Sequence, residues 1–428
     1  MYEKHYPQLK ETVYSETLTN GLQVTIVPKK GFRKTYAVFT TNYGSIDNEF
    51  VPIGLDRIAH VPDGVAHFLE HKMFEKEDGD VFQKFGQLGA SANAYTSFTK
   101  TSYLFSTTDH VYENLETLLD FVQDPYFTEE TVEKEKGIIA QEIQMYQDSP
   151  DWRLSFGLLN NLFPTHPIHI DIAGTVESIQ DIRPEDLYMS YDTFYHPSNM
   201  KLLVVGNVDP EMTLAFIKEN QDSKDFIAVP PVKRHTPVET KDAIIHESHI
   251  EMDIMRPKVL VGGRYFGELP EKPLDRHRFQ LAAHYGLSLL FGETSRHYSE
   301  WYENGLIDDS FYNSFSLERD LCFFEIGGDT PNPELLASNI EALLMSLPAL
   351  DLTEEGLERL KRQHLGRLLN SLNSVEFIAN HFEDDNDGVS IFDQPELIET
   401  ITIQDVKAAL NKIISHDTLT RVYMTPKS

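Results

Sequence analysis

Two histidines one helical turn apart stand in the segment PDGVAHFLEHKMFE, residues 62–75. His67 and His71 are four residues apart and Glu70 is three residues after His67, so a helix would present all three on one face. Zinc favours imidazoles at this spacing, because their ring nitrogens can converge on one tetrahedral centre. A nearby carboxylate that is not a ligand can take a proton from the attacking water and pass it to a leaving amine. The segment therefore predicts zinc-dependent hydrolysis, with Glu70 as the general base.

A catalytic zinc site needs a third protein ligand, and an acidic segment further along the chain can supply it. The segment EETVEKEKGIIAQEIQMY, residues 129–146, is predicted to be a helix. Glu135 and Glu142 are seven residues apart there, which is two helical turns, so they share one face. Ile138 and Ile139 are expected to give this helix its buried side. A carboxylate on that face could reach the metal, and Glu135 could orient a ligand histidine.

Each of these features also has a purely structural interpretation. The first helix could be an ordinary amphipathic helix that buries Val65, Phe68 and Met73 and turns its polar residues toward solvent. The carboxylates of the second helix, Glu135 among them, could simply be solvated. In either case Asp63 is expected to cap the first helix.

The elements that must position these residues follow the same order in two halves of the chain. In the first half, strands are predicted around residues 22–26 and 37–41, helices follow, and the apolar run KLLVVG at 201–206 is typical of a buried strand. In the second half, KVLVGGRYF at 258–266 precedes predicted helices, and TLTRVYM at 418–424 follows them. This order predicts an α+β protein with two related mixed α/β domains.

The boundary between the domains is expected in the stretch 223–240, which contains three prolines and shows neither helical nor alternating periodicity. Residues 1–222 would form an N-terminal domain that carries the zinc site. Residues 241–428 would form a related C-terminal domain without a metal site. Each would contain about 200 residues, a common domain size.

Composition excludes some classes of function. The chain has 37 Lys and Arg against 68 Asp and Glu, a formal net charge of −31, which argues against a nucleic-acid partner. The acidic surface could attract basic peptides or could serve solubility alone.

No apolar run is long enough to span a bilayer, and the first residues do not resemble a secretory signal. With Cys322 as its single cysteine, the chain is expected to be cytoplasmic.

With these motifs in place, the sequence resembles the pitrilysin/insulinase zinc metallopeptidases, the inverzincins named for H-x-x-E-H. HFLEH at 67–71 matches the metal motif, and EKGIIAQE at 135–142 matches the downstream pair of glutamates. Further matches are GASANAYTSFTKTSY at 89–103, HPIHIDIAGTVESI at 166–179 and YHPSNMKLLVVGNVD at 195–209. The resemblance implies antiparallel-rich sheets covered by helices in a clamshell arrangement. It also implies one Zn²⁺ per chain, held by His67, His71 and Glu142, with Glu135 supporting a ligand.

The resemblance also implies how a peptide substrate is bound. In the family, the strand that matches Ser91 to Thr96 is an edge strand that pairs with the substrate backbone. Ser91, Asn93 and Ala94 are therefore expected to contact the substrate. Asn93 would position or polarise the scissile carbonyl; without the resemblance it would be interpreted as a turn or strand-end residue.

The C-terminal half departs from the family pattern. Active members use an Arg and a Tyr in a stretch that matches residues 292–312, but here these positions hold Trp301 and Asp308. Some bacterial members work as two different chains, one with the zinc motif and the other with the Arg/Tyr pair. The resemblance therefore implies a heterodimer with a related chain. A homodimer is the alternative, as is local replacement of the missing Arg by Arg296.

These observations together predict a zinc endopeptidase that cleaves unstructured peptides, or processes a precursor peptide, inside an enclosed chamber. The alternative is a non-catalytic scaffold or assembly protein on the same fold. A scaffold that keeps zinc for stability needs the ligands but not Glu70, so the presence of Glu70 favours the enzyme.

Overall fold

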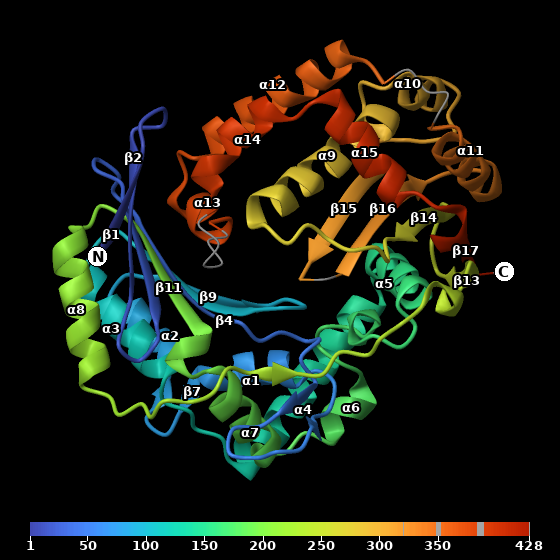
Figure 1. The fold of residues 1–428 in the computed structure, drawn as a ribbon. Helices are drawn as coiled ribbons and strands as arrows, with labels where there is room; N and C mark the ends of the chain where they lie inside the picture. Colours follow the sequence, from blue (N-terminus) through green and yellow to red (C-terminus); the bar gives the residue numbers. More distant parts are fainter. Residues whose placement is uncertain (320, 348–351, 383–388, 428) are drawn as a thin grey trace. The chain divides into compact units, whose positions relative to one another are not determined.

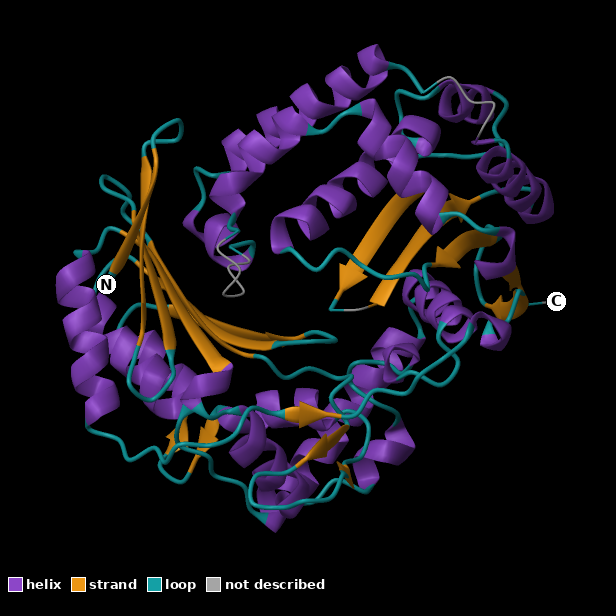
Figure 2. Ribbon diagram, in the orientation of Figure 1, coloured by secondary structure: helices purple, strands orange, loops and turns teal. Residues whose placement is uncertain are grey.

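The computed structural model describes residues 1–319, 321–347, 352–382 and 389–427, and it divides into two compact units of sheet and helices (Figure 1, Figure 2). The first unit comprises Met1–Gln144, Ile170–Thr236 and Ser371–Glu383, and the second comprises Met145–His169, Pro237–Asn370 and Asp384–Ser428. The predicted boundaries 1–222, 223–240 and 241–428 treat the chain as a linear succession of domains, and they stay a prediction. Each spatial unit, by contrast, contains a segment from the other half of the chain: the first unit contains Ser371–Glu383, and the second contains Met145–His169.

The first unit is built on a seven-stranded sheet with the strand order β1-β2-β3-β11-β4-β10-β9. Strand β11 is parallel to β3, and the other neighbouring pairs are antiparallel. Strand β9 therefore lies at one edge of this sheet. The strands are β1 (Tyr2–Tyr6), β2 (Glu11–Thr17), β3 (Gln23–Pro28), β4 (Thr35–Thr41), β9 (Ser91–Thr96), β10 (Thr101–Thr107) and β11 (Met200–Gly206).

Helices cover both faces of this sheet. Helices α1, α3 and α8 pack on one face, and α13 packs against β4 and β11 on the other (Figure 1). This explains why β4 is buried along nearly its whole length: Ala37 and Phe39 enter the main core, whereas the Tyr36 hydroxyl donates to Asn380 of α13 at 3.4 Å. The helices are α1 (Val65–Met73), α2 (Val81–Gln87), α3 (Val111–Val122), α4 (Glu129–Gln147), α6 (Val176–Gln180), α7 (Pro184–Phe194), α8 (Pro210–Asp222) and α13 (Val375–Asn380).

Two small sheets complete the first unit. One has the order β12-β5-β6, and the other pairs β7 with β8 directly after α1. Their strands are β5 (Glu49–Val51), β6 (Ala59–His60), β7 (Glu75–Lys76), β8 (Gly79–Asp80) and β12 (Lys233–Arg234).

The second unit has a five-stranded sheet with the order β13-β17-β14-β16-β15. Its strands are β13 (Glu247–Met252), β14 (Lys258–Arg264), β15 (Tyr312–Glu318), β16 (Leu321–Asp329) and β17 (Leu419–Pro426). Its helices are α5 (Pro150–Leu162), α9 (Pro273–Phe291), α10 (Arg296–Glu303), α11 (Pro333–Met345), α12 (Glu354–Ser371), α14 (Gln394–Thr400) and α15 (Ile403–Ile413).

The two sheets share one pattern. In the first unit the strands β3-β11-β4-β10-β9 are neighbours in that order, and only the first of these pairs is parallel. In the second unit β13-β17-β14-β16-β15 repeat both the order and the directions. The prediction of two related mixed domains with antiparallel-rich sheets is confirmed at the level of sheet topology.

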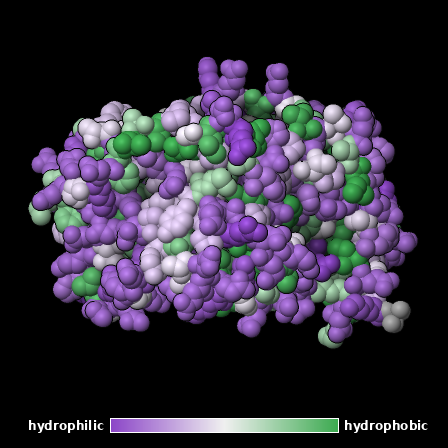
Figure 3. All heavy atoms as spheres, turned by 90° about the horizontal axis from the view of Figure 1, so that it is seen from below, coloured by the Kyte–Doolittle hydropathy of each residue, from purple (hydrophilic) through white to green (hydrophobic). Residues whose placement is uncertain are grey.

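Hydrophilic side chains dominate the face shown in Figure 3, and apolar side chains are scattered among them in small groups. This pattern agrees with the formal net charge of −31. Within the described ranges, none of the helices combines the length and the apolar character needed to cross a bilayer.

Candidate metal centre

Helix α1 carries the histidine pair, and its first turn is fixed by a glycine. Gly64 is the residue before the helix and has φ 91°, a conformation that favours glycine. A Cβ at this position would lie 2.4 Å from the carbonyl oxygen of Ala173, so a larger residue could not fit. The predicted cap by Asp63 is wrong, because its carboxylate instead accepts a hydrogen bond from Asn48 at 2.8 Å.

Helix α1 buries polar side chains as well as its apolar stripe. Val65, Phe68 and Met73 are buried as expected, but His67 and Glu70 are only 9% and 7% exposed. The alternative in which the polar residues of this helix face solvent is therefore wrong. The functional side chains are held inside the first unit, where a polar group needs a partner or a ligand.

Helix α4 brings the two glutamates to α1. Val132, Ile139 and Ile143 are its buried apolar residues, whereas Ile138 is 49% exposed, so the predicted burial of Ile138 is wrong. The reason is geometrical: successive residues of a helix are rotated by about 100°, and the buried arc includes only one of the two neighbouring isoleucines. Glu135 on the same helix is buried, as expected for a residue that faces another helix rather than solvent.

The structure brings the three predicted ligands together. The Oε2 atom of Glu142 lies 3.8 Å from Nε2 of His67 and 3.6 Å from Nε2 of His71. One donor atom from each of the three side chains lies within 4.8 Å of the others. Donors about 2.1 Å from a tetrahedral zinc ion are roughly 3.4 Å apart, so these side chains fit the ion after small movements.

Glu135 contacts the ligand histidine His71, and Lys72 contacts Glu135 in turn. Nδ1 of His71 lies 3.0 Å from Oε1 of Glu135, which places the ring proton on Nδ1 and leaves Nε2 free to bind a metal. The other oxygen of Glu135 lies 3.8 Å from the ammonium of Lys72, which also pairs with Glu75. Lys72 was not among the residues predicted from the sequence, although a lysine directly after a predicted metal ligand was a visible signal.

The pKa values of the two histidines shift in opposite directions. Burial lowers the pKa of His67 to about 3, and the neighbouring His71 acts in the same direction, so His67 is neutral at pH 7. Burial also acts to lower the pKa of His71, but the hydrogen bond to Glu135 and the charges of Glu70, Glu135 and Glu142 outweigh it and raise that pKa. Protons therefore compete with a metal ion more strongly at His71 than at His67.

Glu70 has the environment of an acid–base group. Burial raises the pKa of Glu70 to about 6, and the charge of Glu142 acts in the same direction, against the hydrogen bond from Thr96 and the charge of His71. The Thr96 hydroxyl donates to Oε2 of Glu70 at 2.6 Å. A pKa near the working pH suits a group that both takes and returns a proton. Thr96 was not predicted as a site residue, since its only signal was its place at the end of the predicted edge strand.

Strand β9 is the edge strand next to this site. It pairs with β10 on one side, and no described strand pairs with its other side. Ser91 and Asn93 are exposed, and Oδ1 of Asn93 accepts a hydrogen bond from the N–H of Ala94 at 2.9 Å. Ala94 packs against the core of the first unit. That Ser91, Asn93 and Ala94 contact a substrate stays a prediction.

The residues at the family's Arg and Tyr positions have structural partners in the second unit. Trp301 is 9% exposed and packs against Phe291 and Phe311. The carboxylate of Asp308 pairs with Arg256 and accepts from Ser310. Neither residue offers a guanidinium or a phenol.

Arg296, the local alternative, is a surface residue of α10. Its side chain is 85% exposed, and its Nε lies 2.6 Å from Glu300 one turn further along the same helix. Its charge is therefore already paired within that helix.

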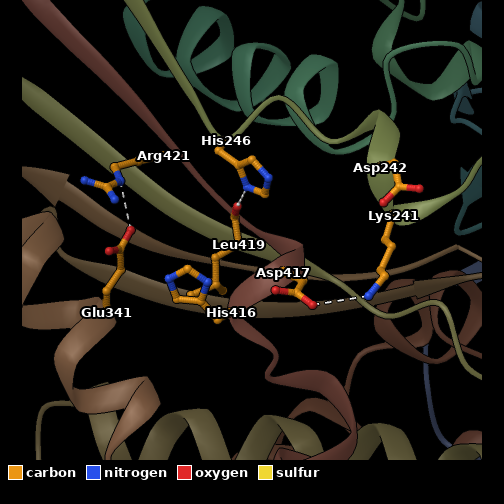
Figure 4. Close-up of a pocket in the computed structure, with 8 residues that line it drawn as sticks. All are labelled: Lys241, Asp242, His246, Glu341, His416, Asp417, Leu419 and Arg421. Carbon is orange, nitrogen blue, oxygen red and sulfur yellow. Dashed lines mark hydrogen bonds and ion pairs between the residues drawn. The ribbon is translucent and has the colours of Figure 1, made fainter.

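A separate pocket of about 360 Å³ lies in the second unit (Figure 4). Two ion pairs, Lys241–Asp417 and Arg421–Glu341, stand in it, and His246 donates to the carbonyl of Leu419 at 2.9 Å. Its charged groups are thus largely paired with one another. The remaining lining residues are Asp242 and His416, so the pocket contains none of the predicted site residues.

Comparisons with known proteins identify relatives of the whole chain. The profile described as insulinase (peptidase family M16) matches residues 60–176, and the profile described as the M16 inactive domain matches residues 181–364. The uncharacterized zinc protease YmfH of Bacillus subtilis is 51% identical over 429 residues, which are 99% of each chain. The zinc protease PqqE of Helicobacter pylori is 26% identical over 450 residues, covering 100% of this chain and 95% of that one.

A solved structure extends the likeness to three dimensions. The crystal structure of an M16-like peptidase from Alicyclobacillus acidocaldarius superposes with a TM-score of 0.91 at 37% identity, covering 97% of this chain and 99% of that chain. The resemblance seen in the motifs is confirmed along nearly the whole length. The chain that gathers His67, His71 and Glu142 on two facing helices is a member of the insulinase family of zinc proteases, peptidase family M16.

Proposed function

We propose that this chain is a zinc-dependent endopeptidase that cleaves unstructured peptides or processes a precursor peptide. His67, His71 and Glu142 would hold one Zn²⁺, and Glu70 would be the general base. The observation that carries this proposal is the convergence of three metal donors from α1 and α4, with a buried carboxylate beside them that is not one of the three. Relatives named zinc proteases support the same reaction class.

The chemistry that zinc supplies when bound is Lewis-acid polarisation of the scissile carbonyl and of the attacking water. The residues of the chain would do the rest. Glu70 would take the proton of that water and return it to the leaving amine, and the hydroxyl of Thr96 would hold Glu70 in place. Glu135 would keep the ring proton of His71 on Nδ1, so that Nε2 remains a ligand.

The edge strand β9 supports the choice of substrate class. An extended peptide could add to its open side through main-chain hydrogen bonds, which give affinity without requiring a particular sequence. Ser91, Asn93 and Ala94 would contact that peptide, and Asn93 would position the scissile carbonyl. Most strands of a folded protein are already paired within its own sheets, so unstructured segments are the proposed substrates.

The missing Arg and Tyr support a shared site. Because Trp301 and Asp308 cannot stabilise the developing negative charge, we propose that a related chain supplies the Arg/Tyr pair, and that the two chains enclose a common chamber. The alternative to this heterodimer is a homodimer, in which two copies of the chain enclose the chamber. A cytoplasmic location belongs to this proposal and is supported by the single cysteine, Cys322, which cannot form an intrachain disulfide.

One substitution tests the proposed reaction. Glu70→Gln should keep one zinc per chain and reduce peptide hydrolysis by about 10²-fold or more, the usual scale of general acid–base catalysis. Zinc would be measured by elemental analysis, and hydrolysis with a quenched fluorescent peptide, in the presence of the candidate partner chain. Unchanged turnover in the Glu70→Gln protein would refute the role of the base.

The scaffold alternative is favoured by one observation, the loss of the family's Arg and Tyr at Trp301 and Asp308. It predicts that no peptide is hydrolysed by the unmodified chain, alone or with a related chain. It also predicts that Glu70→Gln has no effect on assembly or stability, because a purely structural zinc ion does not use a base.

A further inference from the structure

Lys72 is a fully buried lysine directly after the predicted ligand His71. Its side chain has no solvent exposure. A buried ammonium is costly unless carboxylates or other acceptors surround it. Lys72 has two such carboxylates, Glu75 one turn further along the chain and Glu135 on α4. Its position therefore links the end of α1 to the middle of α4.

The two oxygens of Glu135 face different partners. Oε1 lies 3.0 Å from Nδ1 of His71, and Oε2 lies 3.8 Å from the ammonium of Lys72. Glu135 is only 8% exposed, so little water can reach it to orient the group. The carboxylate is consequently held from two sides, by His71 on one and by Lys72 on the other.

We propose that Lys72 is a positioning residue of the metal site, which acts on His71 through Glu135. By fixing Oε2 of Glu135, the ammonium leaves Oε1 directed at Nδ1 of His71, so that Nε2 of this ring stays turned toward Glu142. The side chain of Glu75 is 33% exposed and pairs with the same ammonium from one turn further along the chain. The inference rests on the proposed zinc site.

A merely structural ion pair would behave differently. If Lys72 only tied α1 to α4 through its ion pair with Glu135, its removal would lower the free energy of unfolding without a specific effect on zinc affinity. If Lys72 acts through Glu135, replacing Lys72 should no longer change the zinc affinity once the carboxylate of Glu135 has been replaced. A double-mutant cycle separates these two cases.

The experiment measures zinc affinity of the full chain by competition with a chromogenic chelator. Lys72→Met should weaken zinc binding by about 10-fold or more, within the 10–100-fold range usual for partners of ligand residues. Glu135→Gln should weaken it similarly, and adding Lys72→Met to Glu135→Gln should change it no further. The matched control is Lys76→Met, a second buried lysine, whose ammonium donates to the backbone carbonyl of Asp124. This control should bind zinc like the unmodified chain.

Two further measurements keep the test decisive. The double variant Lys72→Met/Glu75→Gln removes the ammonium together with its local partner, so it leaves no new unpaired charge at Glu75 if Lys72→Met alone does not fold. It should show the same loss of about 10-fold. The visible absorption of Co²⁺ bound in place of zinc, which reports ligand geometry, should change in the Lys72 variants and not in Lys76→Met.

Equal zinc affinity in the unmodified chain and in the Lys72 variants would overturn the inference while leaving the zinc site intact. So would an equal loss on the Glu135→Gln background. Failure of the unmodified chain to bind zinc would instead overturn the proposed function, so the two failures are distinguishable.

Discussion

Three glutamates lie in the proposed metal site, and each has different neighbours. Glu70 accepts a hydrogen bond from the Thr96 hydroxyl, Glu135 accepts one from His71, and Glu142 faces Nε2 of both histidines. The side chains are chemically the same, so in the proposed mechanism their partners would decide which carboxylate serves as base, support or ligand. Burial strengthens these differences, because solvent cannot equalise the environments.

The ligand assignment predicts the effect of removing a ligand. His71→Ala and Glu142→Gln should weaken zinc binding by more than the roughly 10–100-fold expected for a supporting residue, because only two ligands remain. Elemental analysis after dialysis measures the bound zinc. Glu133→Gln, an exposed position on the same helix as Glu142, is the control and should retain one zinc. Full occupancy in either ligand variant would mean that the assignment is wrong.

The hydrogen bond from Thr96 predicts a change in the pH dependence of hydrolysis. This bond lowers the pKa of Glu70, so Thr96→Val should raise that pKa. The base must be ionised to act, so activity falls as pH decreases through this pKa, and the acidic limb of the pH–rate profile should move to higher pH. Thr96→Ser, which keeps the hydroxyl, should leave the limb in place. A limb that does not move in Thr96→Val contradicts the contact.

At the scale of elements, local pattern predicted much of the structure. The expected strand at 201–206 is β11 (Met200–Gly206), and the expected helix at 129–146 is α4 (Glu129–Gln147). These elements have strong apolar periodicity, which neighbours in the sequence are enough to establish. The pair His67 and His71 was equally visible, because one helical turn separates its members.

What the sequence did not reveal depends on contacts between distant residues. Thr96 reaches Glu70 across 26 positions, and Lys72 reaches Glu135 on another helix. Asp63 was expected to cap α1, but Asn48 binds its carboxylate and Gly64 fits beside the carbonyl of Ala173. None of these partners can be inferred from periodicity, since each exists only once the elements have packed.

The two helices of the site predict how zinc affects stability. A ligand present at about 1,000 times its Kd stabilises the native state by roughly 4 kcal/mol. A change of 1 kcal/mol shifts the melting temperature by roughly 2–4 °C for 150–250 residues. Zinc should therefore raise the melting temperature of the unmodified chain by several degrees, and a chelator should reverse the rise. His67→Ala should show no rise, and an equal rise in that variant would place the bound zinc elsewhere.

At the scale of the whole molecule, the absent Arg and Tyr predict weak activity of the isolated chain. Loss of a single donor that stabilises an oxyanion costs about 10²–10³ in rate, and Trp301 and Asp308 stand where the family resemblance implies two such groups. Hydrolysis should rise by at least this factor when a related chain with the Arg/Tyr pair is added. A chain that is fully active alone, with no increase on mixing, would show that Arg296 or another residue replaces the pair.

The exchange of segments between the two units has a consequence for synthesis. Helix α13, which ends at Asn380, packs on β4 and β11 of the first unit and accepts the hydrogen bond from Tyr36. A ribosome makes β11 long before α13, so the face of this sheet that α13 covers must remain open while the intervening chain is made. Until α13 has been made, that face lacks its final cover, so the first unit reaches its final form only near the end of synthesis.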